Sequence, residues 1–158
     1  MKKGLLLINL GTPEAPKVSS VRSYLAEFLV DRRVIELNAL LRYVLVYGLI
    51  LPLRPRKTTE AYRSIWTAEG SPLLILSQQL TKKVHDAVKD THTVVLGMRY
   101  GEPSLQHALA QLKNHDEITI IPLYPQYASS SSGSAIEAVL TIMRSWKILP
   151  TLHIIRDF

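Results

Sequence analysis

The sequence contains no cysteine. A disulfide framework, a thiolate zinc site, a catalytic thiol and a cysteine-held iron–sulfur cluster are therefore excluded for this chain. The sequence also lacks any run of about 18 uncharged apolar residues, which a membrane-spanning helix would need. The apolar run Leu5–Leu10 is shorter than the core of a signal peptide, which is about 7–15 residues long, and it contains Asn9. We expect this run to be a buried strand of a protein in a reducing, cytoplasmic setting.

Glycine is scarce too, with 7 of 158 residues, whereas 47% of the residues are hydrophobic and 20% are charged. These values exclude collagen-like and disordered chains, and the length predicts one globular domain spanning residues 1–158. The net charge of +6 arises within the first 63 residues, because lysine and arginine balance the acidic residues in the remainder. Such an excess favours contact with phosphates, acidic lipids or carboxylate ligands. Neither a Cys/His finger nor a long basic cluster is present, so no nucleic-acid partner is expected.

Short apolar runs alternate with stretches of helical periodicity along the whole chain. The runs that predict strands are 4–9, 93–98, 118–123 and 151–155. The stretches that predict helices are 20–30, with Ser19 or Ser20 as N-cap, 58–65, 72–88, 104–112 and 134–145. This alternation predicts a doubly wound α/β fold, with a four-stranded parallel sheet and helices on both faces.

The loops that follow the first three predicted strands, 9–16, 99–104 and 124–134, are rich in glycine, proline and polar or aromatic residues. Ligands of such sheets bind beyond the carboxyl ends of the strands, so we expect these loops to line one cleft. The serine run Ser129–Ser132 precedes a predicted helix that Ser134 could cap, which favours an anion site there. Gly11-Thr12-Pro13 lacks the glycine and lysine pattern of a nucleotide loop.

The segment 34–53 is predominantly apolar, and its only charged residues are Glu36 and Arg42. Two interpretations remain open. One is a buried core helix. The other is a lip that lies in a bilayer interface, with arginines on either side near an anionic lipid surface and Tyr43 and Tyr47 at the headgroup level.

The five histidines show no metal-ligand spacing, so we expect no metal site. Four of them are interpreted as solvated surface residues. His153 alternates with apolar neighbours in the last predicted strand, and we expect it to be a hydrogen-bonded core residue.

Four motifs in order carry a resemblance to a known family: LLLINLGTPEAP (5–16), YRSIWTAEGSPLL (62–74), GMRYGEPS (97–104) and IIPLYPQYASSSSGS (120–134). Together they resemble ferrochelatase, the enzyme that inserts ferrous iron into a porphyrin to form haem. The resemblance runs from Lys3 to Phe158. It implies a chelatase-like fold and one of two similar domains, the N-terminal half, with the porphyrin bound between this half and the missing C-terminal half.

The resemblance also implies which residues contact the porphyrin. Those that match the family's motifs are Arg54, Tyr62, Ser71, Leu10, Arg99, Tyr100 and Tyr124. Their chemistry suits a flat apolar ring with carboxylate arms, which needs a guanidinium, hydroxyls and apolar walls. The metal-facing histidine and acidic residue of the family belong to its second half, so no catalytic residue is assigned in this chain and we expect the chain alone to be inactive.

Fe²⁺ is expected as a substrate, and no resident cofactor is expected. Ser129 stands where the eukaryotic branch has a cysteine ligand, so no iron–sulfur cluster of that kind is expected. The apolar segment 34–53 resembles the membrane-facing lip of members that use protoporphyrin, which favours protoporphyrin IX and a peripheral place at the inner membrane surface. Two alternatives stay open: a porphyrin-binding or membrane-docking module without catalysis, and a short chelatase that completes its cleft as a homodimer.

Overall fold

The computed structural model describes residues 1–158 and contains one parallel sheet of four strands. The strands are β1 (Lys3–Gly11), β2 (His92–Tyr100), β3 (Glu117–Pro122) and β4 (Thr151–Ile154). They pair in the order β2-β1-β3-β4, with Leu6 of β1 opposite both Val95 and Ile120. The four predicted strands and the parallel α/β fold are therefore confirmed.

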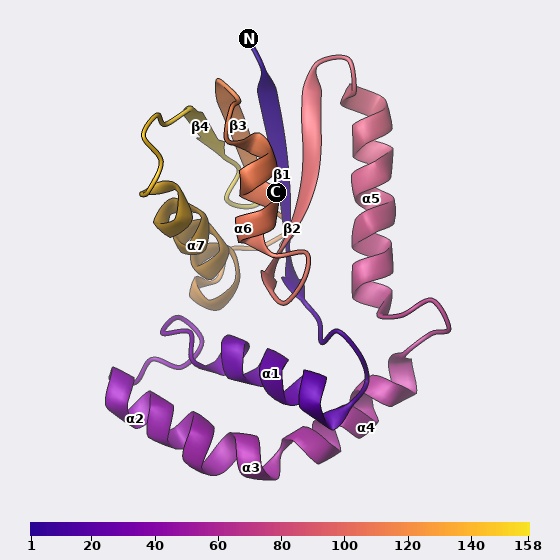
Figure 1. The fold of residues 1–158 in the computed structure, drawn as a ribbon, viewed down its shortest axis with the longest axis vertical. Coiled ribbons are helices and arrows are strands. Elements are labelled where there is room, and N and C mark those ends of the chain that lie inside the picture. The colour runs from indigo at the N-terminus through magenta and orange to yellow at the C-terminus, as the bar shows by residue number, and fades with distance from the viewer.

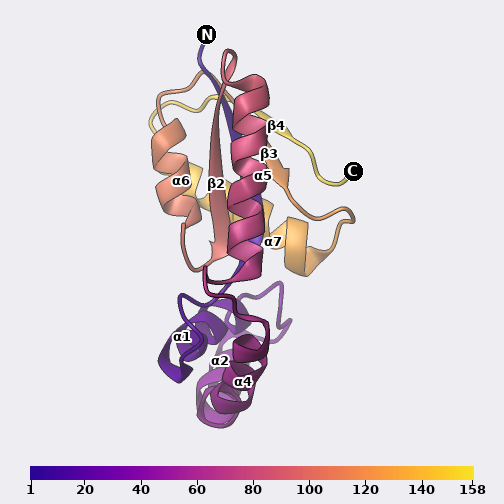
Figure 2. The same ribbon diagram turned by 90° about the vertical axis from the view of Figure 1, so that its right-hand side faces the viewer.

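The two faces of the sheet are covered unequally (Figures 1 and 2). Helices α6 (Leu105–Leu112) and α7 (Ser134–Met143) pack on one face, where Leu6, Leu109 and Ile120 are fully buried. Burial of each such side chain stabilises the fold by about 1.5–3 kcal/mol. Helix α5 (Pro72–Val88) alone covers the other face, through Leu74 and Val84. Helices lie on both faces, as the alternation of elements predicts.

The helices between β1 and α5 form a separate layer beyond the carboxyl ends of the strands, which we call the cap (Figure 1). Its elements are α1 (Val18–Leu29), α2 (Ala39–Tyr43), the π-helical turn η1 (Val44–Ile50), α3 (Leu51–Leu53) and α4 (Pro55–Ile65). Helix α1 packs against α4, and the chain between β1 and α5 is occupied entirely by this layer. The cap therefore faces the edge of the sheet where ligands of parallel sheets bind.

Several local expectations need correction. Helix α1 begins at Val18, so neither Ser19 nor Ser20 is its N-cap. Helix α4 begins at Pro55 rather than at Thr58, because proline at the first helical position already has the helical φ angle. His153 is exposed on the four-residue edge strand β4, where its side chain lies 3.7 Å from Glu117, so the expectation of a core histidine is wrong.

The interpretation of 34–53 as a buried core helix is also wrong. Only Val46 and Leu51 of this segment are buried. Most of its large apolar side chains face outward, among them Leu40 with 74% and Leu53 with 69% of their surface exposed. None of the helices has both the length and the apolar character needed to cross a membrane. We call the segment 34–53, of which residues 39–53 are helical, the lip.

Candidate functional site

A row of aromatic rings connects the cap to the sheet. Tyr100, the last residue of β2, meets Phe28 of α1 edge-on at 5.2 Å between ring centroids. Phe28 stacks on Tyr24 at 6.2 Å, and Tyr24 meets Tyr62 of α4 at the same separation. Trp66 follows at 6.4 Å from Tyr62. The row is continuous because Tyr24 and Phe28 are four residues apart and share one helix face, which lies between β2 and α4.

A buried carboxylate lies beside this row, at the corner that follows α1. Asp31 has only 7% of its side chain exposed. Its Oδ2 accepts hydrogen bonds from Arg99 Nη2 at 2.6 Å, from the Tyr100 hydroxyl at 2.8 Å and from the Ser134 hydroxyl. Its Oδ1 accepts from the backbone N–H of Arg33 at 2.7 Å. A buried charge with one cationic and three neutral donors is fully satisfied, so the corner is held firmly on the sheet.

These contacts determine the protonation of Asp31. Burial alone would raise its pKa, but the hydrogen bonds from Ser134, Arg33 and Tyr100, together with the charge of Arg99, bring the pKa below its usual value. Asp31 is therefore ionised at neutral pH. The predicted cap at Ser134 is wrong, because the serine run forms the π-helical turn η2 (Ser129–Gly133), which continues into α7. Ser134 lies inside this helix and donates its hydroxyl to Asp31.

A second ion-pair cluster adjoins the first. Arg32 and Arg33 both donate to the carboxylate of Glu137 on α7. These hydrogen bonds, first from Arg33 and then from Arg32, lower the pKa of Glu137. Three consecutive residues, 31–33, thus tie the cap to α7 and to the end of β2.

The tyrosines of the site are held in their neutral form. Burial raises the pKa of Tyr124 to about 12, although the charge of nearby Arg99 opposes the shift. Burial also raises the pKa values of Tyr24, Tyr62 and Tyr100. At neutral pH these phenols donate hydrogen bonds and do not act as bases. The Tyr124 hydroxyl is buried and has no hydrogen-bond partner.

A cavity of about 680 Å³ opens between the cap and the α5 side of the sheet. Tyr24, Trp66 and Ser71 are among its lining residues, as are Gly101 and the loop after β1. The lining also includes four glutamates and neither lysine nor arginine: Glu14, Glu27, Glu69 and Glu102. This charge suits an uncharged or cationic group, and it places the recognition of ligand carboxylates elsewhere, on the arginines.

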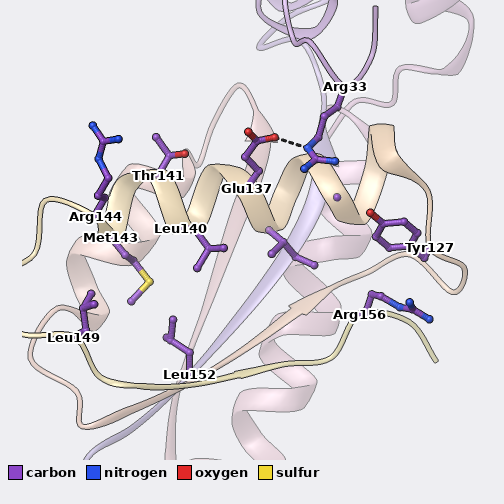
Figure 3. A pocket seen from close by; sticks show the side chains of 12 residues that line it. Arg33, Tyr127, Glu137, Leu140, Thr141, Met143, Arg144, Leu149, Leu152 and Arg156 are labelled. Carbon is purple, nitrogen blue, oxygen red and sulfur yellow. Dashed lines mark hydrogen bonds and ion pairs between the residues drawn. The ribbon is translucent and has the colours of Figure 1, made fainter. Parts of the chain in front are cut away.

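Figure 3 shows a second pocket, of about 600 Å³, on the far side of α7. The side chains of Leu140 and Met143 from α7 and Leu152 from β4 point into it, and the ion pair of Arg33 with Glu137 lies at its rim. None of the seven residues that the resemblance assigns to porphyrin lines this pocket. It is therefore separate from the site at the carboxyl edge.

The structure brings four of those seven residues together. Tyr62 and Tyr100 belong to the aromatic row, the guanidinium of Arg99 lies 4.5 Å above the ring of Tyr100, and Tyr124 is close enough to Arg99 to sense its charge. Tyr100 is fully buried and uses its hydroxyl within the protein.

The other three residues lie apart from this group. Ser71 lines the 680 Å³ cavity, and Leu10 is half-buried near the end of β1. Arg54 is exposed between α3 and α4, and its side chain makes no hydrogen bond or ion pair within the chain. The expectation that three loops line one cleft holds for the loops after β1 and β2. It fails for 124–134, because no residue of that loop lines the 680 Å³ cavity. The loop instead meets the end of β2 through the hydrogen bond from Arg99 to Ser134.

Sequence reasoning missed Asp31, Tyr24, Phe28 and Trp66. In the sequence, Tyr24 and Phe28 were interpreted only as part of the apolar face of a helix. Two aromatic residues on one helix face could have indicated an aromatic cluster. Asp31 follows an apolar run and precedes two arginines, which gives no indication of its partners. No three acidic or histidine side chains gather as metal ligands anywhere in the chain.

The fold and the candidate site together define a class: an α/β domain with a parallel sheet and, at the carboxyl edge of that sheet, a cavity under a helical cap that contains a row of aromatic rings. Comparison with known proteins narrows this class. The ferrochelatase family model matches residues 2–158, and the chain belongs to the ferrochelatase family.

Relatives agree with this assignment. The chain is 53% identical to the ferrochelatase of Legionella pneumophila (strain Corby), over 100% of this chain and 48% of that protein. It is 44% identical to ferrochelatase 2 of Shewanella oneidensis, over 99% of this chain and 50% of that protein. The chain is 47% identical to the ferrochelatase of Methylobacillus flagellatus, over 99% of this chain and 47% of that protein. The chain spans about half the length of the curated relatives it matches.

Proposed function

We propose that this chain supplies the porphyrin-binding half of a cleft in which ferrous iron is inserted into protoporphyrin IX to form haem. The observation that carries the proposal is that four of the matched residues are linked at one edge of the sheet, although they come from α4, β2 and the loop after β3. Tyr62 connects to Tyr100 through the rings of Tyr24 and Phe28, and Arg99 lies over Tyr100 and close to Tyr124. Membership of the ferrochelatase family and the similarity to ferrochelatases support the same reaction.

The residues present fit a porphyrin chemically. The half-buried rings of the row, Phe28, Tyr62 and Trp66, and half-buried Leu10 offer apolar surface to the ring. Arg54 and Arg99 offer guanidinium groups to its carboxylates, and Ser71 adds a hydroxyl. Fe²⁺ enters this scheme as a substrate. The neutral tyrosines hold and orient the ring, and the pyrrole protons go to a base other than these phenols.

Binding is tested by titrating the purified chain with protoporphyrin IX and following the porphyrin emission. We expect a shifted spectrum, and a weaker shift for Tyr62→Leu, which interrupts the aromatic row. Tyr127→Leu is the matched control, because Tyr127 lies at the separate pocket of Figure 3. Equal binding by both variants and the parent chain would show that the row does not form the porphyrin surface.

Adding Zn²⁺ to the same samples shows whether the chain only binds the porphyrin or also inserts a metal into it. Retention of the free-base spectrum is the expected result. It fits a binding half whose metalation needs residues from a partner domain. Conversion to the metalloporphyrin above the protein-free rate would instead favour a short chelatase that works as a homodimer.

We further propose that the lip docks on an anionic membrane surface and keeps the cleft near a poorly soluble porphyrin. Tyr43, Val44, Tyr47 and Leu49 of the lip are all about half exposed or more, and the rings of Tyr43 and Tyr47 stack at 5.8 Å. The basic side chains of 54–57 are exposed just beyond the lip. Apolar side chains beside basic ones are what an interfacial helix needs on a surface of anionic lipids.

A further inference from the structure

The orientation of the Arg99 guanidinium is set within the chain before any ligand arrives. Nε donates to the Ser134 hydroxyl at 2.7 Å, and Nη2 donates to Asp31 at 2.6 Å. The guanidinium carbon lies 4.5 Å above the ring of Tyr100. Two hydrogen bonds and a stacked ring define the plane of the group, whereas Nη1 makes no hydrogen bond. The Nε–Nη2 edge of the guanidinium is therefore used within the protein, and Nη1 remains free to donate to an anion.

Asp31 is the residue on which this arrangement depends. It contacts Arg99 directly, and its Oδ2 also accepts from Ser134 and Tyr100, which are the other two groups that hold the guanidinium. Because Asp31 is ionised, the charge of Arg99 is balanced on the protein side of the group.

We propose that Asp31 is a positioning residue: it holds Arg99 so that the free Nη1 side of the guanidinium receives a carboxylate of the porphyrin. The identity of the ligand rests on the proposed function, whereas the fixed guanidinium rests on the geometry alone. A pre-oriented guanidinium loses less rotational freedom on binding than a mobile one, and it therefore binds a carboxylate more tightly. Asp31 itself touches no ligand.

Two porphyrins separate positioning from general support of the fold. Deuteroporphyrin IX carries two carboxylates, whereas its dimethyl ester has the same ring without the charges. Asp31→Asn is expected to weaken binding of the acid by about tenfold, in line with the loss of one charge-assisted hydrogen bond, and to leave binding of the ester unchanged. Ser134→Ala, which removes the acceptor of Nε, is expected to show the same selective loss.

Glu137→Gln is the matched control. It removes a carboxylate from the same corner, bonded to Arg32 and Arg33 but not to Arg99, so it should weaken neither porphyrin. Equal losses for acid and ester in Asp31→Asn would overturn the proposal, because Asp31 would then act only through the fold. Unchanged binding of the acid in Asp31→Asn would overturn it as well.

The side-chain Nε–H signal of Arg99 in an NMR spectrum tests the fixed guanidinium without any ligand. Hydrogen exchange at this group is expected to be slow in the parent chain and in Glu137→Gln, and faster by at least about tenfold in Asp31→Asn. If the parent chain binds neither porphyrin, the proposed function fails, and so does the proposed binding of a porphyrin carboxylate by Arg99. The exchange rate of the Arg99 Nε–H group would still decide whether Asp31 orients Arg99. Equal exchange in all three proteins would overturn the orienting role too.

Discussion

Gly11 and Tyr100 lie opposite each other where β1 and β2 end, and a Cβ atom at Gly11 would be 1.7 Å from the Tyr100 carbonyl oxygen. Gly11 also has a φ of 107°, which other residues rarely adopt. The close approach of these two strand ends places Tyr100 under the cap. The glycine of the Gly-Thr-Pro motif is thus required by the backbone and not by a nucleotide.

Gly11→Ala is expected to lower the free energy of unfolding by more than about 3 kcal/mol, because the contact is with backbone and cannot be relieved by a rotamer change. Gly48→Ala is the control. Its Cβ would meet nothing within 4 Å in the helical lip, so stability should stay the same or rise by up to about 1 kcal/mol. Urea unfolding measures both, and a Gly11→Ala protein as stable as the parent would contradict the strand-end geometry.

Two tyrosine hydroxyls are expected to have opposite effects when removed. Tyr124→Phe deletes a buried hydroxyl without a partner, so the free energy of unfolding should stay the same or rise by about 1 kcal/mol. Tyr100→Phe deletes a hydroxyl bonded to Asp31 at 2.8 Å and within 3.2 Å of Ser134, and should cost about 1–3 kcal/mol. Denaturant unfolding at neutral pH compares the two. A greater loss for Tyr124→Phe would mean that its hydroxyl has a partner in the folded protein.

Stability should fall in acid partly through Asp31. Its pKa is lower in the folded chain than in the unfolded one, where it is about 3.9, because hydrogen bonds from Ser134, Arg33 and Tyr100 outweigh the effect of burial. Its ionised form therefore stabilises the fold above about pH 4, and this contribution disappears as the pH falls through the folded-state pKa. Glu137, whose pKa is also lowered by hydrogen bonds from Arg33 and Arg32, likewise contributes stability that is lost in acid.

Urea unfolding between about pH 6 and pH 3 measures this effect. Asp31→Asn is expected to be less stable than the parent at neutral pH and to lose less stability on acidification. Asp86→Asn, on the exposed side of α5, removes the same charge without an ion pair. Identical pH profiles for these two variants would show that Asp31 does not carry the acid sensitivity.

Substitution of Leu40, Leu49 and Leu53 by serine is expected to reduce co-sedimentation with vesicles that contain phosphatidylserine. All three side chains are at least half exposed, so stability should change by no more than about 0.5 kcal/mol per site. Leu51 is unsuitable for this test because it is buried. The control replaces Leu76, Leu80 and Ile148, which are exposed outside the lip. Equal sedimentation of both triple variants and the parent chain would contradict docking through the lip.

Local patterns determined the elements of the fold. Short continuous apolar runs such as Leu5–Ile8, followed by Gly11 and Pro13, predict strands covered on both faces, and the four β-strands are where these runs predict them. Pro72, followed by apolar residues at helical spacing, located the start of α5 correctly. The helices on both faces followed from the alternation, because crossovers between parallel strands are right-handed. The strand order β2-β1-β3-β4 did not follow from it and came from the structure. The resemblance in four motifs led to the family.

Contacts across long sequence distances were decided by the tertiary structure. Asp31 and Arg99 are 68 residues apart, and no periodicity links them; they meet because α1 ends where β2 ends. The lip has the composition of a core helix, yet it is exposed because only other cap helices pack against it. Periodicity shows which residues of an element are apolar, whereas burial depends on which neighbours the fold places beside them. For that reason the sequence by itself determined the strands, the helices and the family, and only the folded chain decided the aromatic row, the exposed lip and the fixed guanidinium of Arg99.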